Sequence, residues 1–547
     1  MNNNFVGYKK IGVLFLLAAL SVGDGSSASS VSGSPDGGSG YDLTTAEQAR
    51  ADFYDDFVAK TLVRGAHVTP VLAPIKWTNL GVDGFAGRIA ELDLRTEFIA
   101  ADTSAKMRRA IVKLNNARMD RHIASRLQIL RVAPIKFYPD FSDEANPFFF
   151  VANMDQSVSD QGVARGDRLL AINGINTSEY IDSLSPFLRF STTRHMLVTE
   201  VPRYLSARDA GVIDSSLYQG KSDNTVTYTL ESFADNNTYD ITLQYNFANE
   251  RDVSWLDPFI LELDREDFTS DEMAYESQYT ALGFTQIFDT HKDAALYVNH
   301  AEQMALIEWY DFDDTRETVQ DLISAALAEG ILDYDLIVDA THSGGGNSSA
   351  LLVQILASEA FKTTFGNVRT DDIAFVNANK ANHGSDVEVW IQQALDGGAS
   401  FTTNEPFKLE FFPQGGNGMM EPAEKRFTGN IVALFFPLGG SNLDQFASMV
   451  IDNPQLDIHT IGMPPGGYSN TWEWKETLNV PGLGDVDFEW NIGHTIRPNG
   501  EILEGNPAEP VQKILFTRDN FDTYFADLIE VAQQYLNSLQ TDASPAS

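Results

Sequence analysis

The hydrophobic pattern near the N-terminus is that of amphipathic helices. Phe53 and Phe57 recur at the four-residue spacing that places side chains on one helical face. Ahead of them, Thr44 and Glu47 form a capping-box pattern, which marks the start of a helix. We therefore expect residues 44–135 to form a mainly helical N-terminal domain.

Residues 136–250 change to a strand-like pattern. Five segments in this block have the pattern of strands, most of them with aromatic and β-branched residues: FYPDF, FFFVANM, RLLAING, TVTYTLESF and YDITLQY. Between them, Gly166 predicts a turn, and the pair Asn173 and Gly174 predicts a tight hairpin. This block is expected to be a β domain.

Strand and helix patterns alternate from residue 251 onward. Two short apolar runs, YDLIVDA and NIVALFF, have the length and composition of buried strands. Each precedes an amphipathic pattern typical of a helix, SSALLVQILASEA and SNLDQFASMV. The alternation predicts an α/β fold for residues 251–547, with functional loops at the carboxyl ends of the strands.

Length, charge and the lack of cysteine limit the classes of function. The chain has 547 residues, which predicts two or three domains rather than one core. Its 77 acidic and 38 basic residues give a net charge of −39. Such a charge argues against binding to nucleic acids or anionic membranes, since both need a basic surface. Without cysteine, the chain has no disulfides, thiolate catalysis or cysteine metal sites.

The N-terminus has the order of features found in secretory signal peptides. Lys9 and Lys10 precede an apolar run over 11–22, which is shorter than the roughly 20 residues that a membrane-spanning helix needs. Residues 1–28 are therefore expected to be a signal peptide, and residues 29–43 a linker rich in glycine and serine. This predicts a secreted or periplasmic protein without an integral membrane anchor.

Two strand-to-helix junctions carry the candidate chemistry. The first is a glycine loop with Gly345 and Gly346 at its end, and such loops aim backbone N–H groups at a ligand. No Gly-Lys-Ser/Thr follows, which disfavours a phosphate loop. At the second junction Ser441 lies between a strand and a helix, where a serine is either a helix cap or a nucleophile. For a nucleophile, the N–H groups of Asn442 and of the glycine loop would stabilise the oxyanion.

The order of several motifs resembles that of the C-terminal processing peptidases, or tail-specific proteases. They are Asp-x-x-x-x-Gly-Gly-Gly at the first junction, Gly-x-Ser-x-x-Asp-x-Phe-Ala at the second, and Asn-Gly-Glu-Ile-Leu-Glu-Gly farther on. The segment QGVARGDRLLAINGINTSEY is similar to the core of a PDZ domain, which binds extended peptides. The resemblance covers roughly residues 105–520. It implies a crotonase/ClpP-like protease core, a PDZ-like domain over 136–250 and Ser441 as the nucleophile.

The same resemblance supplies candidates for the base and the acid. The best-known branch of the family uses a lysine about 25 residues after the serine, but this chain has Gly466 there. Lys475, in the segment TWEWKET, is expected to be a surface residue of a strand. A second branch, which includes the tricorn core protease and the chlamydial protease-like activity factor, uses a Ser–His–Glu triad. By this resemblance His122 is the base and Glu504 the orienting acid, with Glu501 as the second candidate for the acid.

Histidine suits a general base because its unperturbed pKa is near 6.5, and a carboxylate on its second nitrogen fixes its tautomer. His342 in the glycine loop and His494 near the glutamates are rival bases. The resemblance predicts an exported serine endopeptidase that acts on polypeptides, and no metal or cofactor motif is present. The alternative is a catalytically inactive relative that binds peptides or other ligands. A homo-oligomer is left open.

Overall fold

The computed structural model describes residues 43–125, 129–209, 224–247, 278–290, 292–313, 315–346, 348–379, 385–406, 417–469 and 472–542. The chain divides into two compact units, Met1–Thr44 and Thr45–Ser547, and the elements below belong to the second. The predicted signal peptide, 1–28, lies outside the described residues, as does the linker, 29–43, except for its last residue.

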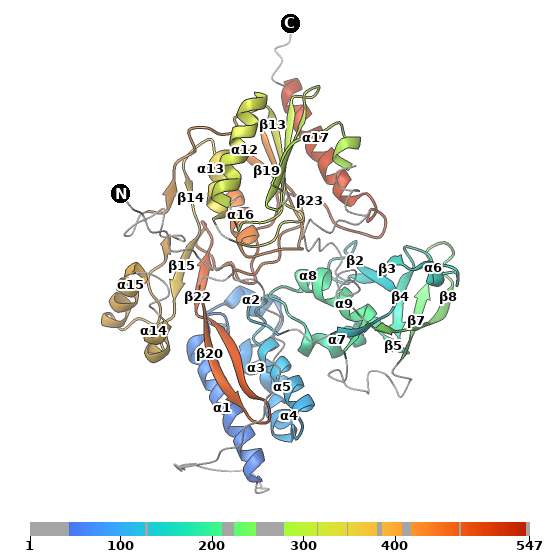
Figure 1. Ribbon diagram of the computed structural model, residues 1–547, viewed down its shortest axis with the longest axis vertical. Helices are drawn as coiled ribbons and strands as arrows, with labels where there is room; N and C mark the ends of the chain where they lie inside the picture. The colour runs from blue at the N-terminus through green and yellow to red at the C-terminus, as the bar shows by residue number, and fades with distance from the viewer. Residues whose placement is uncertain are drawn as a thin grey trace. The chain divides into compact units, whose positions relative to one another are not determined.

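Five helices follow Thr44, as the N-terminal pattern predicts (Figure 1). They are α1 (Thr45–Arg64), α2 (Pro74–Asn79), α3 (Gly84–Glu91), α4 (Leu94–Ala100) and α5 (Ser104–Asn116). Phe57 of α1 is fully buried, and its ring contacts Phe488 and Trp490. Both belong to a hairpin of β20 (Glu473–Val480) and β21 (Gly484–Asn491). The N-terminal helices therefore pack on a segment from the far end of the sequence.

An antiparallel sheet follows, with the strand order β2-β3-β4-β7-β8 and with β5 paired to β4. Its strands are β2 (Ile135–Asp140), β3 (Phe148–Met154), β4 (Arg168–Ile172), β5 (Ile175–Asn176), β7 (Thr225–Glu231) and β8 (Thr238–Gln244). Asn173 and Gly174 join β4 to β5 with φ angles of 52° and 83°, the left-handed conformation that a two-residue hairpin needs. The predicted hairpin is confirmed, and so is the turn at Gly166, where φ is 91°.

Helices that the strand-like pattern does not predict lie in the same block. They are α6 (Gln156–Ser159), α7 (Thr177–Leu184), η1 (Ser185–Phe187), α8 (Thr193–His195), η2 (Met196–Glu200) and α9 (Val201–Ser206). A small sheet in the order β6-β1-β9 joins β1 (Ile129–Val132), β6 (Ala207–Asp209) and β9 (Asn246–Phe247). The helical segment 191–200 contacts the candidate site described below.

A seven-stranded sheet, in the order β10-β11-β12-β13-β18-β19-β23, forms the α/β part of the chain. Its strands are β10 (Thr285–Asp289), β11 (Ala294–Asn299), β12 (Met304–Trp309), β13 (Asp335–Asp339), β18 (Ile431–Phe435), β19 (Ile458–Gly462) and β23 (Gln512–Lys513). The neighbouring strands β12, β13, β18, β19 and β23 run parallel to one another. β11 is antiparallel to both of its neighbours, β10 and β12. The predicted alternation of buried strands and helices is confirmed in this sheet.

Helices cover both faces of the seven-stranded sheet (Figure 1). On one face lie α12 (Thr315–Glu329), α13 (Ser349–Leu356) and α16 (Asn442–Ile451), and on the other lies α17 (Tyr524–Asp542). Successive strand residues alternate between the two cores: Leu336 and Val338 pack with the first three helices, and Ile337 packs in the core that includes α17. Because both faces are buried, the strands are continuous apolar runs.

Shorter elements account for the rest of the described secondary structure. They are β14 (Phe361–Lys362) paired with β17 (Met419–Met420), β15 (Phe365–Val368) between β16 (Glu405–Pro406) and β22 (Gly493–Ile496), the helices α14 (Ile373–Asn379) and α15 (Ser385–Asp396), and η6 (Pro454–Leu456). Lys475 lies on the exposed side of β20, where it forms an ion pair with Glu489. It is therefore a surface residue of a strand, as predicted.

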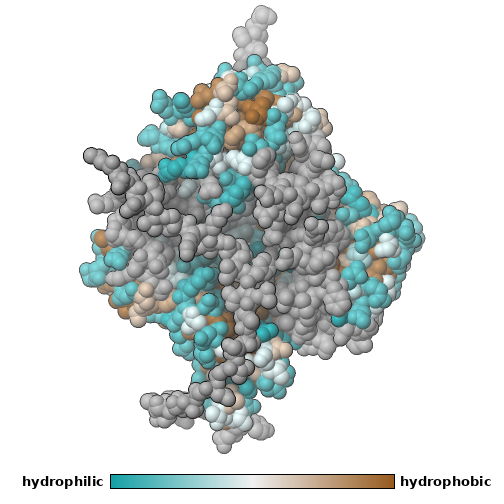
Figure 2. Space-filling view, in the orientation of Figure 1, coloured by the Kyte–Doolittle hydropathy of each residue, from teal (hydrophilic) through white to brown (hydrophobic). Residues whose placement is uncertain are grey.

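In the coloured part of the face drawn in Figure 2, hydrophilic residues predominate and hydrophobic residues gather in separate groups. Val71 and Val511 are exposed apolar side chains on separate segments, and scattered single residues of this kind are normal on protein surfaces. Within the described residues, we find no helix with both the length and the apolar character needed to span a bilayer.

Candidate active site

The two predicted junctions lie side by side at the carboxyl edge of the sheet, because β13 and β18 are parallel neighbours. A Cβ atom on Gly345 would lie 3.0 Å from the Cβ atom of Ser441. Asn442 links the two loops, since its Oδ1 accepts the N–H of Ser349 at 3.0 Å and its Nδ2 donates to the carbonyl oxygen of Gly346. The glycine loop and the serine therefore form one site.

Ser441 has a strained backbone at the start of α16. Its φ and ψ angles are 60° and −115°, in a region that residues with a side chain rarely adopt. Although the residue occupies the N-cap position, its hydroxyl makes no capping hydrogen bond. The side chain of this serine therefore does not cap α16. A half-buried hydroxyl on a sharp strand-to-helix turn is the arrangement found for nucleophilic serines.

The loop 466–469 lies against this turn. Asp444, in the first turn of α16, accepts the N–H groups of Gly467 and Tyr468 on its two carboxylate oxygens, each at 2.9 Å. The carbonyl oxygen of Tyr468 in turn accepts the N–H of Ser441 at 2.5 Å. Burial raises the pKa of Asp444 well above its ordinary value, and the two hydrogen bonds from the backbone N–H groups of Gly467 and Tyr468 oppose that rise. In the lysine-using branch this loop carries the base, whereas here it is fixed to the serine turn through Asp444.

The ring of Tyr468 joins the serine turn to two histidines. It packs so closely on Gly440 that a Cβ atom there would overlap it. Its centroid lies 4.9 Å from that of the His122 ring and 4.7 Å from that of the His195 ring. His195 is fully buried, and its Nδ1 lies 3.0 Å from the carbonyl oxygen of Pro437, just before the serine turn.

His122 lies on a turn after α5 that is held from several sides. Its backbone N–H donates to Oδ1 of Asp120 at 3.2 Å, and Oδ2 of Asp120 accepts Nδ2 of Asn491 at 3.1 Å. The N–H of Arg121 donates to Oγ of Ser191 at 3.1 Å. Loss of hydration around the imidazole lowers the pKa of His122 to about 4, and the charge of Asp120 opposes this effect. The ring is therefore neutral at neutral pH and able to accept a proton.

The expected triad is not closed by hydrogen bonds. Among the described residues, nothing bonds to Nδ1 of His122, which is buried, and no hydrogen bond joins this ring to Ser441 or Glu504. The structure brings His122 and the serine turn against the same tyrosine ring, Tyr468, but it does not bring their reactive atoms into a direct bond.

The two candidate acids occupy very different environments. Glu504 is fully buried, where its Oε1 lies 3.1 Å from Nζ of Lys76 and its Oε2 accepts the N–H of Ser469 at 3.2 Å. Burial raises the pKa of Glu504 to about 7, and the charge of Lys76 opposes the rise. Glu501 is half exposed and accepts a hydrogen bond from Asn506 at 3.1 Å, as a surface turn residue does. Burial beside the site favours Glu504 over Glu501.

The rival histidines are both engaged elsewhere. His342 packs on the ring of Phe525 in α17, with 4.4 Å between ring centroids, on the face of the sheet opposite α16. Both ring nitrogens of His494 have partners: Nδ1 lies 3.1 Å from Oδ1 of Asn367, and Nε2 lies 2.8 Å from the carbonyl oxygen of Ala66. These contacts make His494 a satisfied core histidine.

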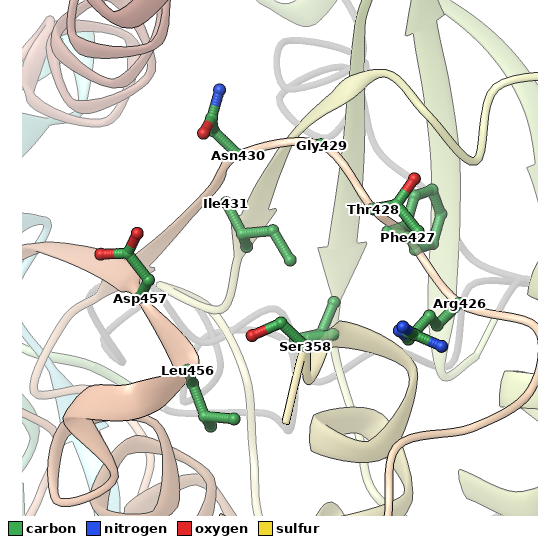
Figure 3. A pocket seen from close by; sticks show the side chains of 10 residues that line it. Ser358, Arg426, Phe427, Thr428, Gly429, Asn430, Ile431, Leu456 and Asp457 are labelled. Carbon is green, nitrogen blue, oxygen red and sulfur yellow. The ribbon is translucent and has the colours of Figure 1, made fainter. Parts of the chain in front are cut away.

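One described pocket lies away from this site. It has a volume of about 230 Å³ and follows the segment 426–431, which leads into β18 (Figure 3). Arg426 and Asp457 supply its charged side chains. Because Ser441 follows the other end of β18, the pocket belongs to the opposite edge of the sheet. The described residues also include no cluster of three or more histidines and carboxylates able to hold a metal ion.

Comparison with solved structures identifies the fold, although no family model and no curated protein matches the chain. Mature CPAF is 14% identical and matches with a TM-score of 0.60, over 92% of this chain and 100% of its own. Mature CPAF complexed with lactacystin is also 14% identical and has a TM-score of 0.59, over 90% of this chain and 100% of its own. The chain has the CPAF fold.

The CPAF fold confirms the predicted resemblance at the level of architecture, a mixed helix and sheet structure. The photosystem II D1 C-terminal processing protease matches as well, at 11% identity over 86% of this chain and 94% of its own. Its TM-score of 0.36 is too low to carry an argument.

Three side chains at the site were missed by sequence reasoning. Lys76 is one of 38 basic residues, in a short helix whose pattern indicates nothing unusual. Tyr468 and His195 contact the site from a loop and from a short helix, and no motif marks either of them. Only the position of Tyr468, in the loop that bears the lysine of the other branch, could have indicated it.

Proposed function

We propose that the chain is an exported serine endopeptidase that hydrolyses polypeptides through an acyl-enzyme on Ser441. One observation carries the proposal: Ser441 has a strained backbone with a positive φ and a hydroxyl that does not cap the helix, directly beside the glycine loop. A helix cap does not require this strain, whereas a nucleophile that must face a substrate does. The CPAF fold supports the same interpretation.

In the proposed reaction, Oγ of Ser441 attacks the carbonyl carbon of the scissile peptide bond while His122 takes the hydroxyl proton. The N–H groups of Asn442 and of Gly345 and Gly346 stabilise the negative oxygen. His122 then gives its proton to the leaving amine, and water hydrolyses the acyl-enzyme by the same steps. Glu504 orients the imidazole and stabilises its charged form.

This mechanism requires a movement, because His122 is not hydrogen-bonded to Ser441 or Glu504 in the described residues. Substrate must bring the His122 ring and Oγ of Ser441 into hydrogen-bond reach, and hydrogen bonds between catalytic groups are often long or misaligned before substrate binds. The Tyr468 ring packs on His122 and on Gly440, next to Ser441, and has to adjust when the two catalytic groups meet.

The finer architecture belongs to the same proposal. Residues 251–547 form a crotonase/ClpP-like catalytic core, 136–250 a PDZ-like domain that admits extended peptides, and 44–135 a helical domain that carries the base. Residues 1–28 act as a signal peptide, so that the mature protein is secreted or periplasmic. Assembly into a homo-oligomer is compatible with this arrangement.

A second candidate is a catalytically inactive relative that binds peptides or other ligands. The observation that favours it is the absence, among the described residues, of a hydrogen bond from His122 to Ser441 or Glu504. If the two groups never meet, the serine lacks a base and the fold can only bind.

Hydrolysis of casein by the purified mature chain separates the two candidates. We expect the wild-type protein to produce new amino termini and the Ser441→Ala variant to produce none above background. Equal release by both proteins would overturn the assignment of Ser441. No release by either folded protein, with casein retained on it, would favour the binding function.

A further inference from the structure

Helix α2 contacts the turn that carries Glu504, the proposed acid. Nζ of Lys76 lies 3.1 Å from Oε1 of Glu504, and both side chains are fully buried. One helical turn later, Nδ2 of Asn79 donates to the carbonyl oxygen of Gly505 at 3.2 Å. Gly505 has a φ angle of 73°, and a Cβ atom there would lie 2.5 Å from the Cβ atom of Lys76. Neighbouring residues of one helix face therefore hold Glu504 and its successor.

The pair has a consequence for the charge of Glu504. A buried carboxylate is neutral at ordinary pH unless a cation or hydrogen bonds stabilise its ionised form. Among the described residues, Lys76 is the one cation that forms an ion pair with Glu504. Nζ also lies 3.5 Å from the carbonyl oxygen of Arg118 and 5.3 Å from the ring centroid of Trp77, and among the described residues Glu504 is the one carboxylate with which it pairs.

The geometry also leaves room for the base. An ionised carboxylate offers about four lone-pair sites. Lys76, the N–H of Ser469 and the hydroxyl of Ser191 take three of these sites on Glu504. One site remains for a further donor, such as the N–H of an imidazole.

We propose that Lys76 is a positioning residue: it keeps Glu504 ionised and fixed in direction, so that Glu504 can stabilise the charged form of His122 during catalysis. This role rests on the proposed function of Ser441, His122 and Glu504. Lys76 is not itself the base, because the described contacts of its Nζ are with Glu504, Arg118 and Trp77 and none is with the serine.

The test measures the rate at which a fluorophosphonate probe labels Ser441 across the pH range, in the full mature chain. The variants are Lys76→Met, Glu504→Gln, the double variant, and Asn79→Ala as a matched control that loosens the same turn without removing a charge. Thermal unfolding of each variant checks that it is folded.

A positioning role predicts three results. Lys76→Met should lower the labelling rate about 10- to 100-fold near pH 7. The loss should shrink at high pH, because the acidic limb of the pH–rate profile moves to higher pH. Asn79→Ala should leave the acid limb where it is. In the Glu504→Gln background, Lys76→Met should change the rate less than about threefold, since the partner through which it acts is gone.

A loss that is the same at every pH and in both backgrounds would overturn the proposal and make Lys76 a structural residue. If Lys76→Met does not fold, Glu504→Gln is compared with the double variant, in which no buried charge is unpaired: equal rates support the proposal, and a further loss beyond threefold overturns it. Wild-type rates in Glu504→Gln would instead remove the acid from the proposed function, and absence of labelling in the wild-type protein would remove the nucleophile.

Discussion

At the scale of single residues, the question is whether Ser441 is a nucleophile or a helix cap. The cap-or-nucleophile question at Ser441 could not be answered from sequence, because serine is common at helix starts for both reasons. The backbone angles favour a nucleophile, since a helix cap usually has extended geometry and this residue does not. The neighbouring glycines were predictable, because close approach of two loops leaves no room for a Cβ atom.

Replacing His122 by alanine should lower kcat/KM at least about a thousand-fold, because loss of the base alone disables a triad. The matched control is His342→Gln, at the rival histidine that packs on Phe525 away from α16. Hydrolysis of casein by both variants measures the difference, and we expect the control to lose less than about tenfold. The reverse order of losses would move the base to His342.

Replacing Gly345 by alanine should lower the labelling rate of Ser441 without unfolding the protein. The new methyl group would lie 3.0 Å from the Cβ atom of the serine, closer than such atoms normally approach. Gly344→Ala is the control, because its methyl group would meet no atom closer than 3.4 Å. Equal rates in the two variants would contradict the contact between the glycine loop and the serine.

The pH dependence of labelling should follow Glu504 rather than His122. Burial raises the folded pKa of Glu504 to about 7, so its useful ionised form is lost as pH falls through that value. His122, with a pKa of about 4, stays neutral over the same range. We expect the labelling rate to rise as the pH passes through about 7. A pH–rate profile whose acidic limb is centred near pH 4, the pKa of His122, would contradict the role of Glu504.

Among helices, strands and loops, prediction succeeded where the pattern is local and long. β13, β18 and their helices were predicted because fully buried strands are continuous apolar runs and the helices after them are amphipathic. The helical segments 177–187 and 193–206 were not predicted; the second changes from α-helix to π-helix and back, which interrupts the 3.6-residue period. Contact between Lys76 and Glu504 could not be predicted, because 428 residues separate them.

The loop 466–469 depends on one carboxylate of α16. Replacing Asp444 by alanine removes the acceptor of the Gly467 and Tyr468 N–H groups, and should cost about 1–3 kcal/mol of unfolding free energy. It should also slow the labelling of Ser441, because the loop holds the serine turn.

The control for this loss is Asp335→Ala. Asp335 accepts the N–H and Nδ2 of Asn430 at the opposite edge of the same sheet. Denaturant unfolding should show a comparable loss of stability, with the labelling rate per folded molecule unchanged. A matching fall in that rate would mean that stability alone controls reactivity.

For the chain as a whole, the arrangement of its blocks makes the site a composite. The helical N-terminal part supplies His122 and Lys76, and the segment 191–200 of the β block holds the His122 turn through Ser191. Deleting the β block is therefore no clean test of peptide binding, since Thr192 and His195 also contact the loops around Ser441.

Export is expected for the same whole chain. The order of lysines, apolar run and small residues at the N-terminus predicts removal of residues 1–28. N-terminal sequencing of the protein recovered outside the cytoplasm should begin near residue 29. Recovery of material that begins at Met1 would contradict the prediction.

The most direct test of the central claim is to map the residue that a fluorophosphonate probe modifies in the purified mature chain. Serine nucleophiles react with this probe only when a base activates them. Mass spectrometry of the digested protein should find the phosphonyl group on Ser441 in the wild type, and on no residue in His122→Ala. A folded wild-type protein in which Ser441 stays unmodified, or in which His122→Ala reacts equally fast, would contradict the account.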